Sequence, residues 1–119
     1  MTSEAYFKRW QTLLTPRFRP HFLPAGHIVF QFRLEQSGHF YLTTSQDHFE
    51  FLPGQHPTPT LTLYLPDQDT VFGLLTGEID GMAAFMAGQY RADGNIILSQ
   101  LLLYLFEKPG EVLAQQVID

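Results

Sequence analysis

Residues 66–106 read PDQDTVFGLLTGEIDGMAAFMAGQYRADGNIILSQLLLYLF. Two short apolar segments in this stretch are followed by glycines, Gly77 and Gly88, as is typical of helix ends. The next run, Ile96–Phe106, has only two clearly polar positions. A helix that is apolar nearly all round must bury both of its sides. The run therefore predicts a helix that rests on a sheet with one side and on a second apolar partner with the other.

Short polar residues stand where these helices should begin. Asp67, Asp80 and Asn95 can each accept a hydrogen bond from an amide of the first helical turn. Gln89–Ala92 is predicted to form a short strand before the last of these helices. After a Pro-Gly pair, Val112–Ile118 has the spacing of a small amphipathic helix at the tail.

Upstream of this region, alternation of apolar and polar residues predicts four strands. Their apolar positions are Ile28, Phe30, Phe32 and Leu34, then Phe40 and Leu42, then Phe49 and Phe51, and finally Leu61, Leu63 and Leu65. Such period-two patterning with short turns favours an antiparallel meander with one apolar face. Val29, Gln31 and Arg33 should then face outward.

We therefore expect a single α+β domain over residues 1–119. Its five-stranded, mainly antiparallel sheet should be covered on one face by helices. The absence of cysteine excludes thiol nucleophiles and thiolate metal sites. The net charge of −5 argues against a nucleic-acid partner. The start of the chain has no apolar run of the signal-peptide type, and Ile96–Phe106 is too short to span a bilayer, so we expect a cytoplasmic protein.

Glu4–Leu14 predicts an amphipathic helix whose apolar side carries Tyr6, Phe7, Trp10, Leu13 and Leu14. Basic residues are concentrated in residues 1–33, where Glu4 is the only acid. One interpretation is that Trp10, Lys8 and Arg9 dock on a membrane surface. The other is that this helix simply covers one edge of the sheet.

The segment Pro59–Phe106 resembles the sterol carrier protein type-2 (nonspecific lipid-transfer protein) domain. The resemblance is carried by LTLYL at 61–65, by the glycine-ended segments that begin at Asp67 and Asp80, by QYRADG at 89–94 and by the apolar run Ile96–Phe106. It implies a five-stranded sheet covered by helices. It also implies an apolar tunnel between the two layers that holds fatty acyl chains, sterols or other lipids.

Twelve residues are candidates for lining this tunnel: Phe32, Leu63, Phe72, Leu75, Met82, Phe85, Met86, Ile97, Leu101, Leu102, Leu105 and Phe106. Simple core packing is the alternative explanation for all of them. An empty cavity of about 500 Å³ would cost on the order of 12 kcal/mol, which is comparable to the total stability of a domain. A tunnel must therefore be occupied, partly wetted or collapsed when no lipid is present.

Catalytic chemistry is not indicated. The five histidines show no metal-ligand spacing, and the aspartates stand at helix caps and turns. No serine elbow, P-loop or dinucleotide fingerprint is present. We expect no metal, no cofactor and no enzymatic activity, although a small enzyme using the same cavity remains a second alternative.

The sequence thus favours a protein that binds, carries or presents a hydrophobic lipid of fatty acyl, sterol-like or isoprenoid type. The main alternative is a non-catalytic interaction module whose apolar surface is buried in a homodimer or against a partner enzyme. Transient contact with a membrane surface is compatible with either function.

Overall fold

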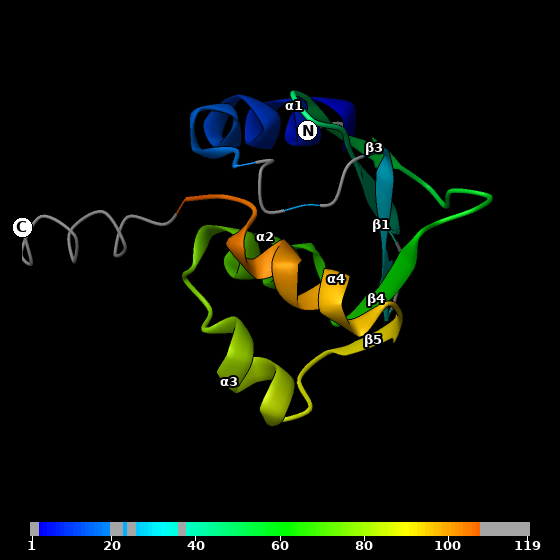
Figure 1. Cartoon of the computed structure of the whole chain (residues 1–119), viewed down its shortest axis with the longest axis vertical. Helices are drawn as coiled ribbons and strands as arrows, with labels where there is room; N and C mark the ends of the chain where they lie inside the picture. Colours follow the sequence, from blue (N-terminus) through cyan, green and yellow to red (C-terminus); the bar gives the residue numbers. More distant parts are fainter. Residues whose placement is uncertain (1–2, 20–22, 24–25, 36–37, 108–119) are drawn as a thin grey trace, which may run out of the picture.

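The computed structural model describes residues 3–19, 23, 26–35 and 38–107. The elements follow in the order α1 (Ser3–Leu14), η1 (Thr15–Arg17), β1 (Ile28–Leu34), β2 (Phe40–Thr44), β3 (Phe49–Pro53), β4 (Leu61–Leu65), α2 (Gln68–Thr76), α3 (Gly81–Met86), β5 (Arg91–Gly94), α4 (Ile96–Leu101) and η3 (Leu102–Tyr104). Figure 1 shows the sheet nearly edge-on, with the α-helices all on one side of it. Among the described residues, none of the helices combines the length and apolar character that a membrane span requires.

The strands form one five-stranded sheet in the order β3-β2-β1-β4-β5. Three of its strand pairs are antiparallel, whereas β1 and β4 run parallel, with Phe32 opposite Leu63. The α+β class and the mainly antiparallel sheet are confirmed, but the prediction of a simple meander is wrong at this pair. The reason is that residues 54–60 leave β3 at one edge and cross β2 and β1 before β4 begins.

The crossing segment, residues 54–60, covers part of the sheet face that carries no helix. Gln31 of β1 is buried there and is only 2% exposed. Its Nε2 donates to the backbone oxygens of Phe40 and Gly54, at 3.1 Å each, and its Oε1 accepts from the backbone N–H of His56 at 2.7 Å. Gln31 was predicted to face outward, and it does alternate with the core residues of β1, but the crossing segment buries it.

The opposite face of the sheet carries the core. Its strand residues are buried, namely Ile28, Phe30, Phe32, Leu34, Phe40, Leu42, Phe49, Phe51, Leu61, Leu63 and Leu65. These are the positions that the alternation marked as inward-facing. From the helical side, α1 contributes Phe7 and Leu14 to the same cluster, whereas Leu13 is 52% exposed.

The three α-helices after β4 begin at the capping residues that the sequence indicated, and α2 also ends at the predicted glycine. The Oδ1 atoms of Asp67 and Asp80 accept hydrogen bonds from the N–H groups of Thr70 (2.8 Å) and Ala83 (3.1 Å). Gly77 ends α2 in the left-handed conformation, with φ of 87°. Asn95 caps α4 in the same way as the two aspartates, by accepting from the N–H of Leu98 at 3.2 Å.

Two predicted bounds are wrong. The fifth strand is Arg91–Gly94 and not Gln89–Ala92, because the N–H of Gln89 still bonds the carbonyl of Ala84 at the end of α3. The predicted helix Ile96–Phe106 is α4 followed by a 3₁₀ turn, η3, and not one continuous rod. The predicted tail helix Val112–Ile118 lies outside the described residues.

The end of η3 is joined to the segment that follows α1. Phe106 forms an antiparallel bridge with Phe18, while Arg19 N–H bonds the carbonyl of Leu105 at 2.8 Å and Glu107 N–H bonds that of Arg17 at 2.7 Å. This extended pairing cannot be made by helical backbone, which explains why the helix stops before Phe106.

Candidate functional site

Between the sheet and the helices lies a continuous set of buried apolar side chains, which we call the apolar layer. Seven of the twelve predicted site residues belong to it, and each is at most 3% exposed: Phe32, Leu63, Phe72, Leu75, Leu102, Leu105 and Phe106. They come from β1, β4, α2, η3 and the residues just after η3. The fold thus brings together side chains that are up to 74 positions apart in the sequence.

The other five predicted residues lie at the margin of the layer or outside it. Phe85 and Leu101 are partly buried and pack against the core. Met82, Met86 and Ile97 are 43%, 81% and 68% exposed. Within the described part of this chain α4 buries only one of its sides, so the second apolar partner that was predicted for the last helix stays a prediction. The helix buries Leu98 and Ser99 and leaves its other side at the surface.

Aromatic rings that sequence reasoning did not assign to the site fill the layer near α1. Phe40 is fully buried and stacks on Phe72, with ring centroids 5.6 Å apart, and on Phe7 at 4.9 Å. Trp10 stacks on the same Phe72 ring at 4.4 Å, with the planes only 4° apart. Phe40 shared the predicted inward face with Phe32, so the alternation itself could have identified it.

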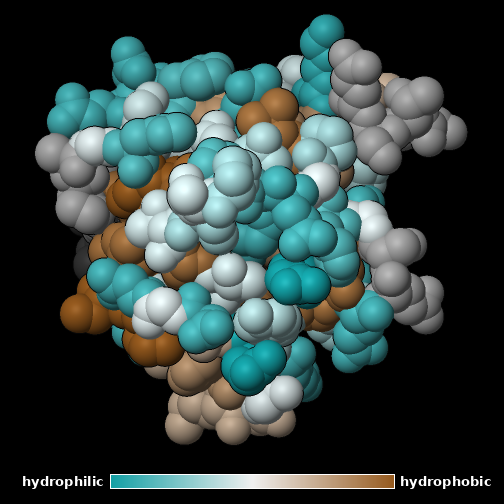
Figure 2. Space-filling model, turned by 90° about the vertical axis from the view of Figure 1, so that its right-hand side faces the viewer, coloured by the Kyte–Doolittle hydropathy of each residue, from teal (hydrophilic) through white to brown (hydrophobic). Residues whose placement is uncertain are grey.

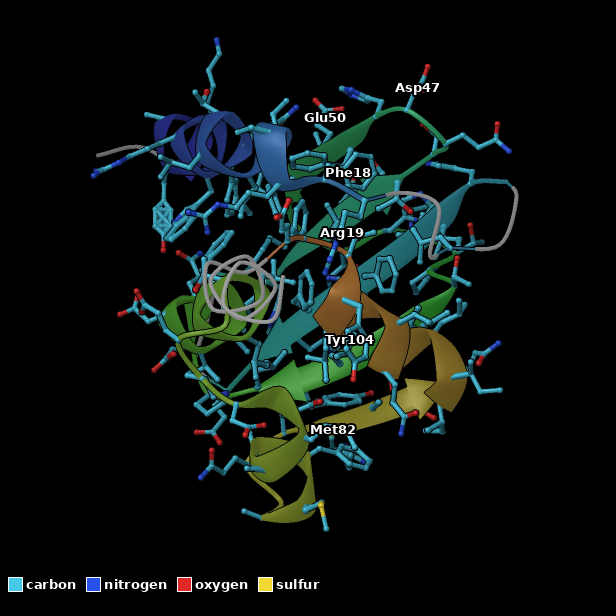
Figure 3. The ribbon with its side chains drawn as sticks, turned by 60° about the vertical axis from the view of Figure 1, so that its left-hand side comes forward. Phe18, Arg19, Asp47, Glu50, Met82 and Tyr104 are labelled. Atoms are coloured by element: carbon cyan, nitrogen blue, oxygen red, sulfur yellow. The ribbon has the colours of Figure 1, made fainter. Side chains whose placement is uncertain are left out.

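A second aromatic group closes the layer near the end of η3. Phe106 packs edge-on against Phe49, with centroids 5.0 Å apart, and Phe49 in turn lies 4.8 Å from Phe18. Arg19 follows directly, and its Nη2 donates to the backbone oxygens of Tyr104 (3.0 Å) and Phe106 (3.5 Å). Figure 3 labels Phe18, Arg19 and Tyr104 in this region. A cation is well placed on such carbonyl groups at the end of a helix.

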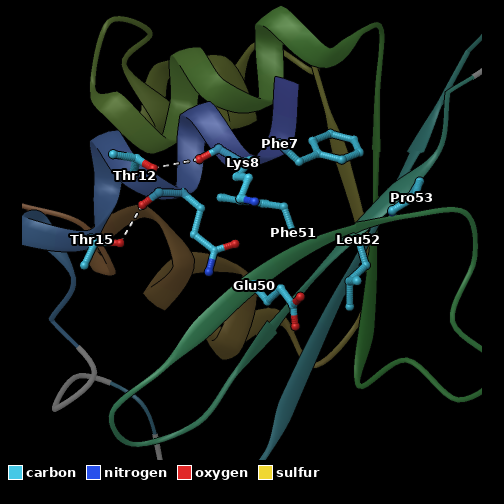
Figure 4. A pocket seen from close by; sticks show the side chains of 9 residues that line it. Phe7, Lys8, Thr12, Thr15, Glu50, Phe51, Leu52 and Pro53 are labelled. Atoms are coloured by element: carbon cyan, nitrogen blue, oxygen red, sulfur yellow. Dashed lines mark hydrogen bonds between the residues drawn. The ribbon is translucent and has the colours of Figure 1, made fainter. Parts of the chain in front are cut away.

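Three hollows of the described structure adjoin the layer or lie near its border. One of about 600 Å³, the α1–β3 groove, is lined by Phe7, Lys8, Gln11, Thr12, Thr15, Glu50, Phe51, Leu52 and Pro53 (Figure 4). Another, of about 410 Å³, adjoins it near Phe18 and Phe49. A third, also of about 600 Å³, is lined by Arg33, Tyr64 and Arg91, which face away from the layer, and by residues at the ends of β1 and β4 and just before β5. None of the three is lined by any of the twelve predicted residues, so the expected tunnel is not seen among them.

The α1–β3 groove reaches the apolar layer because Phe7 and Phe51 belong to both. Its rim is polar. The Nε2 of Gln11 donates to the carbonyl oxygen of Phe49 at 2.9 Å, which ties α1 to the edge strand β3. The interpretation that α1 covers one edge of the sheet thus describes its position.

The three residues predicted to dock on a membrane occupy different environments. Lys8 and Arg9 are exposed on α1, whereas Trp10 is partly buried because its indole stacks on Phe72. Membrane docking through these residues stays a prediction, and the stacked indole would have to leave Phe72 before it could enter a bilayer.

Among the described residues, one ionisable group with a shifted pKa, Tyr90, lies at the border of the layer. Tyr90 is buried, and its hydroxyl donates to the carbonyl oxygen of Gly81 at 3.5 Å; burial raises the pKa of this phenol above its ordinary value. Among the residues that the structure describes, no three histidine, aspartate or glutamate side chains are grouped so that they could hold a metal ion. The arrangement is suited to holding an apolar molecule by burial rather than by specific polar contacts.

Comparison with known proteins identifies relatives of this arrangement. Residues 9–107 match the model of the SCP-2 sterol transfer family. A ubiquinone synthesis protein, UbiJ-SCP2, superposes with a TM-score of 0.67 at 15% identity, over 88% of this chain and 91% of that one. Sterol carrier protein 2 of Aedes aegypti in complex with palmitate gives a TM-score of 0.56 at 21% identity, over 85% of this chain and 93% of that one.

A larger protein contains the same fold. The inverting sec-alkylsulfatase Pisa1 from Pseudomonas sp. matches 90% of this chain with a TM-score of 0.67 at 17% identity, but this chain spans only 16% of the sulfatase. No curated protein matches the chain in sequence. At these identities the structural matches show a shared fold.

Proposed function

This chain belongs to the SCP-2 sterol transfer family, and from that premise we propose that it binds a hydrophobic lipid in the apolar layer and carries or presents it. The observation that supports the proposal most directly is the layer itself. It is a continuous apolar region between a sheet and short helices, and it borders a groove that opens to solvent. The ligand classes proposed are fatty acyl, sterol-like and isoprenoid molecules.

The filled layer is compatible with this function on energetic grounds. An empty cavity of about 500 Å³ would cost on the order of 12 kcal/mol, so a lipid-free protein should close its tunnel. A long acyl chain can replace the lost packing, because each buried methylene contributes about 0.8 kcal/mol. We propose that the helices separate from the sheet when lipid enters, with Phe32 and Leu63 below the ligand and Phe72, Leu102 and Leu105 above it.

We propose a different role for the predicted site residues that are partly buried or exposed. Phe85 and Leu101 would border the ligand at the margin of the layer. Met82, Met86 and Ile97 would meet it only after α3 and α4 have moved, and methionine side chains suit such adaptable contacts.

We propose that residues 1–119 act as one cytoplasmic unit without chemistry of their own. The same fold occurs as a 16% part of an alkylsulfatase and as most of a ubiquinone synthesis protein, which supports a helper role beside an enzyme. In that role the protein would hold a water-insoluble molecule and present it to its partner.

A second candidate function is favoured by one specific observation. Met82, Met86, Ile96 and Ile97 are large apolar residues exposed on α3 and α4. Such residues are suited to an interface with a partner enzyme or with a second copy of the chain. In this case the layer would be only a core, and the exposed residues would carry the function.

Two measurements on the purified protein test the proposal. Palmitate and longer acyl ligands should raise the melting temperature, since they bind only the folded state. Native mass spectrometry should show the monomer with copurified lipid. A melting temperature that no acyl, sterol or isoprenoid ligand changes, together with a lipid-free dimer mass, would favour the interaction module instead.

A matched pair of variants locates the ligand. Leu101→Lys places a charge at the margin of the layer, where a lysine can extend to water, and should weaken palmitate binding about tenfold. Gln100→Lys places the same charge on the exposed neighbouring position and should leave binding unchanged. Equal affinities for the two variants would place the ligand elsewhere.

A further inference from the structure

The outer face of the sheet, opposite the helices, carries a row of three side chains that the lipid function does not use. Arg33 of β1 lies opposite Tyr64 of β4, and Tyr64 lies opposite Arg91 of β5. All three alternate with core residues of their strands, so they point away from the apolar layer. Figure 2 shows this face, on which hydrophilic side chains predominate.

Arg91 is held against the ring of Tyr64, and Arg33 occupies the neighbouring position on β1. The Cζ of Arg91 lies 4.3 Å from the centroid of the Tyr64 ring, which is a cation–π contact. Arg33 is the register partner of Tyr64 on the other flanking strand, and strand spacing puts the two arginine Cα atoms about 10 Å apart. Within the described ranges neither guanidinium forms an ion pair. In a chain with a net charge of −5, two cations that find no ion-pair partner among the described residues form a local positive site in this row.

Arg33, Tyr64 and Arg91 all line one hollow of the surface. A depression of about 600 Å³, the outer-face hollow, is lined by Arg33, Leu34, Glu35, His39, Tyr64, Leu65, Pro66, Gly88, Gln89, Tyr90 and Arg91. His39 adds a further donor, because its Nδ1 accepts the backbone N–H of Leu34 at 2.9 Å and the ring hydrogen therefore belongs on Nε2. Glu35 is the one acid among the lining residues.

We propose that the outer-face hollow binds the phosphate group of a small soluble organic phosphate. Each guanidinium presents a planar fork of N–H donors that fits two phosphate oxygens, and the phenol of Tyr64 and the Nε2–H of His39 can supply further hydrogen bonds. A dianionic group neutralises both arginines, whereas a single carboxylate neutralises one. The phosphate-binding side chains Arg33, Tyr64 and Arg91 of the hollow point to the opposite face of the sheet from the lipid layer, and the proposal does not depend on lipid binding.

A soluble molecule fits the hollow better than a bilayer does. The site is concave and has the volume of a small-molecule pocket. A membrane presents a broad anionic surface, which the net charge of −5 would repel, and an acidic peptide would meet the same repulsion. A compact phosphate carries its charge into the hollow, where the two arginines lie.

The test is a titration of the isotope-labelled protein with sodium pyrophosphate, followed by NMR. Saturable shifts are expected at the amides of residues 88–91 and of Tyr64 and at the side-chain Nε–H groups of Arg33 and Arg91. Arg33→Gln and Arg91→Gln should each weaken binding about tenfold, the loss expected for one charged hydrogen-bonding partner. Arg91→Lys should restore less than half of that loss in free energy, because lysine lacks the planar fork.

Arg17→Gln is the matched control. It removes the same charge from η1, which does not line the hollow, and it should leave pyrophosphate binding unchanged. Because Arg33 and Arg91 are exposed, the melting temperatures of the variants at these two positions should stay close to that of the parent.

Several results would overturn the proposal. They are an absence of saturable shifts, shifts scattered over the whole surface, an equal loss in Arg17→Gln, or acetate binding as tightly as pyrophosphate. Vesicles of phosphatidic acid distinguish a lipid headgroup from a soluble phosphate. Co-sedimentation with such vesicles, lost in Arg33→Gln, without pyrophosphate binding would also overturn it.

Discussion

Gln31 is a single polar residue that fixes the path of the chain across the sheet. Its amide bonds the backbone of β2 through Phe40 and that of the crossing segment through Gly54 and His56. Buried amides are costly unless they are hydrogen-bonded, and here both ends of the group have partners. The side chain thus ties the path of residues 54–60 to the strand pairing beneath it.

Replacing this residue tests that role. Gln31→Leu removes the donor and acceptor and leaves the N–H of His56 and the carbonyl of Gly54 without them, so the protein should lose about 2–3 kcal/mol of unfolding free energy. Urea denaturation measures the loss. The exposed Gln55→Leu, in the same segment, should change stability by less than about 0.5 kcal/mol. Equal stabilities for the two variants would contradict the role given to Gln31.

Asp67 is a second residue with a measurable role, because it caps α2. Its hydrogen bonds from the side chain and the backbone N–H of Thr70 lower the pKa of Asp67 below the model-peptide value of 3.8. A carboxyl group with a lowered folded-state pKa stabilises the fold above its unfolded-state pKa, and this contribution is lost as pH falls through the folded-state value. The cap should therefore weaken only in acid.

Two variants of Asp67 separate the effect of the capping hydrogen bond from the effect of the negative charge. Asp67→Ala should lower stability by about 1 kcal/mol at neutral pH, and its melting temperature should approach that of the parent as pH falls below 3.8. Asp67→Asn keeps a capping oxygen and should be nearly as stable as the parent at neutral pH. A difference between Asp67→Ala and the parent that stays constant down to low pH would show that the ionised carboxylate is not what stabilises α2.

At the scale of elements, the junction between β5 and α4 requires a glycine. Gly94 has φ of 109°, and a Cβ added there would lie 3.3 Å from both Cα and Cβ of Leu61 on the neighbouring strand. Gly88, after α3, also has a positive φ, of 75°, but a Cβ there would meet nothing within 4 Å. The two glycines thus share a left-handed backbone and differ in the space around them.

This difference predicts unequal costs for alanine. Gly88→Ala should lower the free energy of unfolding by about 1 kcal/mol, because a residue with a Cβ is strained in the left-handed conformation. Gly94→Ala should cost about 1–2 kcal/mol more, because its φ is less accessible to other residues and its new methyl group presses on the β4 backbone. Thermal unfolding compares the two variants. Equal melting temperatures would show that β4 can move away from the new methyl group at position 94 without loss of stability.

For the whole molecule, the sheet separates two different surfaces. One face is covered by the helices and the filled apolar layer, while the other carries the crossing segment and the outer-face hollow. The described side chains of the layer are buried among one another, so we expect a lipid to enter only after the helices have moved away from the sheet. Opening should therefore limit how fast the protein takes up a ligand.

The expected result is an association rate that reaches a plateau as the concentration of fatty acid rises. Stopped-flow fluorescence can follow it through Trp10, the only tryptophan of the chain, whose ring stacks on Phe72 in the layer. Phe72→Leu loosens that packing and should raise the plateau. An association rate that increases linearly up to the highest fatty acid concentration would mean that opening does not limit ligand uptake.

Much of this architecture was predictable from local patterns. Alternation in the strands identified Phe32 and Leu63 as inward-facing, and Asp67 and Asn95 marked helix starts, because each signal depends on neighbours within a few residues. Seven of the proposed lipid-layer residues were found in the same way, from the apolar faces to which they belong. The bounds of β5 were missed because the turn after α3 extends to Gln89.

The remaining features depend on contacts between distant segments. Alternation is the same for a strand with a parallel or an antiparallel neighbour, so it could not show that β1 lies beside β4 or that Arg33, Tyr64 and Arg91 form one row. The end of α4 and the filling of the layer likewise depend on Phe106 meeting Phe18 and Phe49. Periodicity specifies which face of an element avoids water, whereas the partner on that face is selected by the packing of the whole chain.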